Sequence, residues 1–241
     1  PVVIGGVEAR ADERVAGVVI GLAHQCQGEV AAVLLGAGVG VGEALEELGL
    51  EYVFDRPLFG MVTRLTYQKG IELVEQAMPD LLRNHDFSLL VLGSGEPGYE
   101  QFFNWLQNEF PGRVGFYRGF NNPLAHRIEA GSDVFLMPSR YEPCGLNQMY
   151  SLKYGAVPLV RATGGLADSV QHFDPKSGYG TGIVFHDFDA NGLAWGMTTA
   201  LKLYANKHAW KQVVYNGMQK DYSWAEQGRL YEERLRKLVR E

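Results

Sequence analysis

The sequence predicts an α/β protein built on a Rossmann-like, doubly wound parallel sheet. From Pro57 onward, short apolar runs alternate with longer segments of helical periodicity, the pattern that parallel sheets with crossover helices produce. The chain has 241 residues, of which 46% are hydrophobic and 21% charged, an ordinary globular composition. No fixed-period repeat or long linker interrupts the pattern after Leu50.

The elements follow from apolar runs, glycine stops and helix caps. A short helix is expected over 43–50, closed near Gly49, and Gly155 ends a later helix. The last helix begins with Ser223 and Glu226 in capping-box spacing, which predicts a C-terminal helical tail. Predicted strands cover 58–63, 87–92, 114–117, 133–138, 157–160 and 181–185. Predicted helices cover 70–84, 99–110, 123–130, 146–154, a short turn after Gly165, 190–205, 209–218 and 223–239.

Residues 1–42 differ from the remainder. Glycine, alanine and valine dominate, and the first aromatic residue is Tyr52 and the first lysine Lys69. The glycines at 36, 38, 40 and 42 do not match G-x-G-x-x-G, because the third glycine would fall at Val41 or Glu43. We therefore expect an atypical lead-in over 1–42 and one ligand-binding domain over 43–241.

Charge and cysteine content exclude several classes of protein. A net charge of -6 disfavours a nucleic-acid partner, and no apolar run is long enough to cross a bilayer. Cys26 and Cys144 are too few for a disulfide framework and favour a reducing compartment, the cytoplasm or, in a plant or alga, the plastid. The start lacks both an initiator Met and a basic leader, so we expect no secretory signal and a fragment of a longer protein.

The most informative stretch runs from Ser139 to Gln148, between a predicted strand and a predicted helix. Ligands of open parallel sheets bind at the carboxyl edge, where this loop lies. Glu142 stands at that edge, and Gly145 and Leu146 open the helix. Unpaired N–H groups at a helix start favour an anion by about 0.3–1 kcal/mol, and a glycine lets it approach closely.

Two cations and a carboxylate are typical of a sugar-diphosphate site. Arg64 and Lys69 flank the loop after the first strand, where they could hold a diphosphate or simply be solvated surface cations. The Glu142 carboxylate could accept from two sugar hydroxyls or stabilise positive charge at an anomeric carbon. Gly164 and Gly165 open another helix, and a plain turn is as good a reading there.

Other patterns favour structural interpretations. Gly93 and Gly95 could make room for a nucleoside or form an ordinary turn, and Phe120 could be a core aromatic. A nucleophilic role for Cys144 is disfavoured because no histidine lies near it in sequence. Asp187 and Asp189 have D-x-D spacing but precede a helix, which indicates N-capping. The six histidines show no metal-site spacing, so we expect neither metal nor cofactor.

The segments S-R-Y-E-P-C-G-L-N-Q and K-Y-G-A-V-P-L-V-R-A-T-G-G-L-A-D-S-V resemble bacterial glycogen synthases and plant starch synthases. The resemblance extends from about Ala44 to the C-terminus. It implies the C-terminal half of a GT-B fold, in which a nucleotide-sugar binds between two Rossmann-like domains. Tyr150 occupies a position where related transferases carry a second Glu, and this favours the glycogen and starch synthases over sucrose- or UDP-sugar-dependent relatives.

The resemblance also implies roles for individual residues. Arg64 and Lys69 would bind the donor diphosphate, Glu142 would contact the transferred glucose, and Phe120 would stack on adenine. The remaining positions that would line glucose and phosphates are Cys144, Gly145, Leu146 and Asn147, aided by the helix start at Gly164 and Gly165.

The implied activity is metal-independent, retaining transfer of glucose from ADP-glucose to the non-reducing end of an α-1,4-glucan. The family's first domain carries K-x-G-G-L, and here Val3 stands where the Lys should be. Because only residues 1–42 precede the resembling part, we expect a fragment that lacks most of the acceptor-side domain. The alternative is a nucleotide-sugar-binding module that is inactive alone, or a half-enzyme that needs a separate N-terminal domain.

Overall fold

The computed structural model describes residues 45, 48–51, 53 and 55–238. The expectations for residues 1–42 fall outside them, as does most of the helix expected over 43–50. The strands are β1 (Leu58–Val62), β2 (Ser88–Gly93), β3 (Val114–Arg118), β4 (Val134–Met137), β5 (Val157–Arg161) and β6 (Ile183–Phe185). The helices are η1 (Tyr67–Lys69), α3 (Ile71–Asn84), α4 (Pro97–Glu109), α5 (Asn122–Gly131), α6 (Asn147–Tyr154), α7 (Gly164–Ser169), α8 (Ala190–Ala205), α9 (Lys207–Met218) and α10 (Trp224–Leu238).

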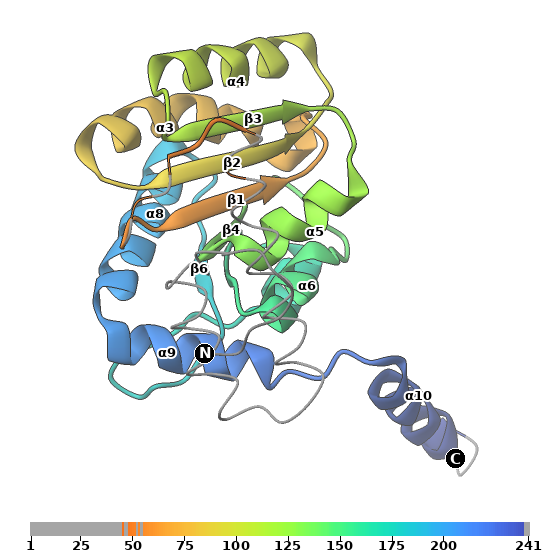
Figure 1. The fold of residues 1–241 in the computed structure, drawn as a ribbon. Coiled ribbons are helices and arrows are strands. Elements are labelled where there is room, and N and C mark those ends of the chain that lie inside the picture. The colour runs from red at the N-terminus through yellow and green to blue at the C-terminus, as the bar shows by residue number, and fades with distance from the viewer. Residues whose placement is uncertain (1–44, 46–47, 52, 54, 239–241) are drawn as a thin grey trace, which may run out of the picture.

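The six strands form one parallel sheet in the order β3-β2-β1-β4-β5-β6. From β1 the chain moves outward through β2 and β3, then returns to the other side of β1 and continues through β4, β5 and β6 (Figure 1). This is the strand order of a doubly wound nucleotide-binding fold, so the predicted fold class is confirmed. The order reverses between β1 and β4, which makes their carboxyl ends the expected ligand crevice.

Alternation along each strand explains why helices cover both faces. On β1, Phe59 and Met61 enter the larger core with α3, α4 and α8, while Leu58 and Val62 point to a second cluster with α5. Successive side chains of a strand face opposite ways, so runs that are apolar at every position must be buried on both sides. Gly60 allows α5 to approach closely, because a Cβ there would lie 2.0 Å from Ser132 Oγ.

The predicted element bounds differ from the observed ones by one or two residues at most ends. The turn η1 escaped prediction because three residues carry no periodicity. The capping box is also only half correct: Ser223 Oγ accepts from Glu226 N at 3.3 Å, but Asp221 rather than Glu226 accepts from Ser223 N. Glu226 instead binds Arg229 one turn along the helix.

Helix α10 extends away from the body of the domain (Figure 1). It buries none of its residues, although it is amphipathic. Its exposed large side chains include Trp224, Tyr231, Leu235 and Leu238, and the first of these is 88% exposed. Apolar stripes of this kind are normally covered by another surface.

One carboxyl group is buried away from the sheet edge. Glu129 on α5 is 3% exposed, and burial raises its pKa to about 7. Its Oε2 lies 3.5 Å from His126 Nδ1 and makes no hydrogen bond. The folded protein therefore holds this proton more tightly than the unfolded chain does.

We expect the free energy of unfolding to fall as pH rises from about 4.5 to about 7, because ionised Glu129 is poorly solvated in the folded state. Glu129→Gln removes this cost, so between pH 5 and pH 8 the variant should gain about 2–3 kcal/mol of stability relative to the wild type. Urea unfolding at both pH values measures it. Glu109→Gln, at an exposed position of α4, is the control. A variant that tracks the wild type at both pH values would contradict this assignment.

Candidate active site

A cavity of about 230 Å³ lies at the crevice between the carboxyl ends of β1 and β4. This is the switch point of the sheet, where the loops after the two strands diverge and leave space between them. Six of the residues predicted for the site line this one cavity: Arg64, Lys69, Glu142, Gly145, Leu146 and Asn147.

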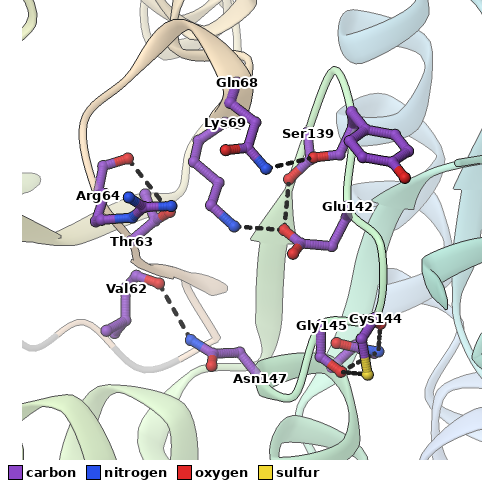
Figure 2. Close-up of polar contacts among 12 residues, drawn as sticks. Val62, Thr63, Arg64, Gln68, Lys69, Ser139, Glu142, Cys144, Gly145 and Asn147 are labelled. Carbon is purple, nitrogen blue, oxygen red and sulfur yellow. Dashed lines mark hydrogen bonds and ion pairs between the residues drawn. The ribbon is translucent and has the colours of Figure 1, made fainter. Parts of the chain in front are cut away.

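An ion pair between Lys69 and Glu142 joins the two sides of the cavity (Figure 2). The Lys69 Nζ lies 2.5 Å from Glu142 Oε2, and the two side chains are only 17% and 9% exposed. Ser139 Oγ also donates to Glu142 Oε2, at 3.3 Å. Lys69 ends η1, and the next residue, Gly70, packs so tightly on Pro138 that a Cβ would lie 2.1 Å from its carbonyl oxygen. The loops after β1 and β4 are therefore held in contact.

Arg64 is the second cation of the cavity. It lies two residues after the end of β1, is exposed, and lies on the side of Lys69 away from Glu142 in Figure 2. The five-residue step from Arg64 to Lys69 does bring both cations to one cavity. Lys69 is paired with Glu142, whereas the Arg64 side chain is exposed to solvent, so their roles as diphosphate ligands stay a prediction.

Helix α6 begins at the floor of the cavity. Gly145 has a φ of 71°, and a Cβ there would meet Gln148 Oε1 at 2.5 Å, so this turn needs glycine. No side chain caps the helix, so its first N–H groups lack acceptors of the usual kind. Asn147 Nδ2 instead donates to Val62 O at 3.1 Å, which ties the helix start to the end of β1.

Gly164 and Gly165 support the loop from behind. A Cβ on Gly164 would lie 2.1 Å from Glu142 O, and one on Gly165 would lie 2.0 Å from Cys144 O. The Gly165 N–H donates to Glu142 O at 3.0 Å. Neither glycine lines the cavity, and the Gly165 amide is engaged by the loop itself. Both glycines therefore contact the backbone of the loop after β4. The phosphate or sugar that the sequence predicted at this helix start stays a prediction.

Phe120 and Cys144 lie outside the cavity lining. Phe120 is 83% exposed between β3 and α5, so the core-aromatic interpretation is wrong. Cys144 is exposed, and its Sγ is 3.5 Å from Gly145 O. Gly93 and Gly95 meet the backbone of Thr63 and Leu65 within 2.1 Å of an added Cβ, which accounts for both glycines by close packing alone.

Several supporting residues escaped sequence reasoning. Gln68 Nε2 donates to Tyr141 O at 3.1 Å, and its backbone carbonyl accepts from Arg140 N at 2.9 Å. Gln148 is fully buried and donates to the carbonyls that precede α6. Both act on backbone groups, which leave no spacing pattern in a sequence.

Two further findings concern metal ions and membranes. In the described part of the chain, His, Cys, Asp and Glu side chains do not gather in threes that could hold a metal ion. Asp189 caps α8 by accepting from Gly192 N at 2.7 Å, so the capping interpretation of the D-x-D pattern is confirmed. Among the helices that the structure describes, none has the length and apolar character to cross a membrane.

Comparisons with known proteins identify the family. Residues 52–216 match the family described as glycosyl transferases group 1. The chain belongs to this family. The match includes the sheet and every lining residue of the cavity.

Glycogen and starch synthases are among the proteins that this chain is similar to. The chain is 49% identical to a glycogen synthase of Anaeromyxobacter dehalogenans over 193 residues and 44% identical to one of Bacillus anthracis over 191. These alignments cover 80% and 79% of this chain, and 40% of each relative. The catalytic domain of starch synthase IV from Arabidopsis thaliana, bound to ADP and acarbose, matches with a TM-score of 0.73 and 33% identity, over 80% of this chain and 41% of that one. The resemblance inferred from sequence is confirmed, and the chain spans about two fifths of the length of these relatives.

The close contact between α7 and the loop after β4 should not tolerate a side chain at Gly165. We expect Gly165→Ala to destabilise the fold by about 1–3 kcal/mol, because the new Cβ would overlap Cys144 O. Gly98→Ala is the matched control, since a Cβ at Gly98 in α4 meets nothing within 4 Å. It should change stability by less than about 1 kcal/mol, in the stabilising direction. Urea unfolding compares the two, and equal stabilities would refute the close contact.

Proposed function

We propose that this chain is the donor-binding half of a retaining glucosyltransferase that passes glucose from ADP-glucose to the non-reducing end of an α-1,4-glucan. The observation that carries the proposal is the Lys69–Glu142 pair, which shares one cavity with Arg64 and the start of α6 at the switch point of the sheet. Similarity to glycogen synthases, and to a starch synthase bound to ADP and acarbose, supports the choice of donor and acceptor.

The diphosphate of the donor would bind to Arg64, Lys69 and the N–H groups at the start of α6. Charge-assisted hydrogen bonds of this kind contribute about 1.5–3 kcal/mol each. Both cations would also neutralise charge on the departing diphosphate, which supplies electrostatic stabilisation where charge develops. The adenine would extend toward exposed Phe120, whose ring is free to stack.

Glu142 would hold the glucose ring. Its carboxylate is paired with Lys69 in the structure, so neither of the two largely buried charges is uncompensated. When the donor enters, the diphosphate would become the partner of Lys69, and glucose hydroxyls would donate to Glu142. Retention would follow from front-face attack, in which the departing phosphate accepts the proton of the acceptor hydroxyl.

A second candidate is a nucleotide-sugar-binding module that is inactive alone or needs a separate N-terminal domain. Two observations favour it: the chain spans 40% of the length of the relatives it matches, and α10 buries none of its residues in the described part of the chain. Exclusion of water and orientation of an acceptor both need a cleft closed on two sides, and a separate N-terminal domain would supply the second side.

Lys69→Ala should weaken ADP binding at least tenfold, because it removes a cation from the diphosphate subsite and leaves Glu142 unpaired. Isothermal titration calorimetry with ADP measures the change. Lys176→Ala, which removes an exposed cation outside the cavity lining, should leave the affinity unchanged. Unchanged affinity in the Lys69 variant would remove that residue from the site.

Two assays separate the candidate functions. Calorimetry with ADP, ADP-glucose and UDP-glucose tests the donor site, and we expect the two ADP ligands to bind more tightly. Glucan extension from ADP-glucose tests turnover. Turnover by this chain alone would refute the inactive module, whereas tight binding without turnover would support it. Failure to bind any of the three ligands would refute both.

A further inference from the structure

The loop between β4 and α6 has a donor for each of its backbone carbonyls from Ser139 to Gly145. The donors come from four residues spread over the sheet edge. The Arg161 side chain donates to the carbonyls of Ser139 and Arg140, and the Gln68 side chain donates to that of Tyr141. The Gly165 N–H donates to the carbonyls of Glu142 and Pro143. The Gln148 side chain donates to those of Cys144 and Gly145.

Arg161 provides the first two contacts. It ends β5, and its Nε lies 2.9 Å from Ser139 O while Nη2 lies 2.5 Å from Arg140 O. Nη1 reaches His186 O at 3.4 Å. Burial, and then the nearby Arg140 charge, lower the pKa of Arg161. Burying a cation is unfavourable unless hydrogen bonds compensate for the lost water, and the bonds to the loop carbonyls provide this compensation.

The side chain of Arg140 also holds this turn in place. Its guanidinium carbon lies 4.0 Å from the ring centroids of both Tyr67 and Phe188, and Nη2 lies 2.8 Å from Glu72 Oε1. Arg140 is thus held by its side chain and, through Arg161, by its carbonyl. Glu142, two residues after Arg140, forms the ion pair with Lys69.

We propose that Arg161 is a positioning residue for Glu142. By holding the carbonyls of Ser139 and Arg140 toward β5, it sets the turn from which the Glu142 side chain points to the opposite wall of the cavity. The planar guanidinium suits this task, because two of its N–H groups span neighbouring carbonyls at a fixed angle. Lysine would keep the charge but offers a single donor centre, so Arg161→Lys separates positioning from simple attraction of an anion.

The chain provides a matched control in Arg113. This arginine also donates to three backbone carbonyls, those of Leu82, His85 and Phe87, at distances of 2.8, 2.6 and 3.2 Å. Burial lowers its pKa as well. Its partners lie at the end of α3 and just before β2, and none lines the cavity. Arg113→Lys therefore measures the general effect of losing guanidinium hydrogen bonds to backbone carbonyls away from the cavity.

The loop itself is tested without ligand, by amide hydrogen exchange over residues 139–149. We expect Arg161→Lys to speed exchange there at least tenfold, while Arg113→Lys leaves this segment unchanged and affects residues 82–88. Equal exchange of the loop in wild type and Arg161→Lys would overturn the proposal. If Arg161→Lys does not fold, Arg161→Gln, which retains one amide donor, replaces it.

The consequence for the donor rests on the proposed function and is measured separately. Arg161→Lys should weaken ADP-glucose binding at least tenfold, whereas Arg113→Lys should change it less than twofold. Faster loop exchange with unchanged ADP-glucose affinity would show that the turn does not position Glu142 for the sugar, and would overturn the proposal. A wild-type chain that binds no ADP-glucose refutes the proposed function instead, and loop exchange still decides the role of Arg161.

Discussion

The contact between Lys69 and Glu142 constrains the whole carboxyl edge of the sheet. The two side chains come from loops after different strands, and both are largely withdrawn from water. If the loops separated, each charge would lose its partner while it remained poorly solvated, and this cost favours close contact between the loops. Strand order makes the meeting possible, because β1 and β4 are neighbours in the sheet although β2, β3 and their helices lie between them in the chain.

Backbone groups explain how the meeting is maintained. The carbonyls of the loop after β4 are engaged by donors from β5, α7, α6 and the η1 turn, whereas the first N–H groups of α6 have no helical acceptor. A loop whose acceptors are all occupied presents mainly donors to the space in front of it. Under the proposed function, these donors and the cations Arg64 and Lys69 would bind the diphosphate with little rearrangement of the loop, which is what preorganised electrostatic stabilisation requires.

Sequence reasoning reached the fold because buried parallel strands read as short, fully apolar runs, and because the intervening helices are amphipathic. The spacing of Arg64 and Lys69 left open whether they bind a diphosphate or are surface cations, and the resemblance to glycogen and starch synthases assigned them, with Glu142, to the donor site. Sequence reasoning did not reach Arg161 or Gln148, whose partners are carbonyls that any residue could supply. It left Phe120 ambiguous between core and ligand, because an isolated aromatic after a strand fits both. The role of Gly165 depended on how closely α7 approaches the loop, a tertiary distance that spacing does not encode.

A crystal structure of the chain with ADP tests the central claim most directly. The account predicts the terminal phosphate in the cavity between β1 and β4, with Lys69 Nζ turned from Glu142 to a phosphate oxygen and the amides at the start of α6 donating to the diphosphate. A nucleotide bound away from this cavity, or one bound there while the Lys69–Glu142 pair stays closed and Arg64 remains apart, would contradict it.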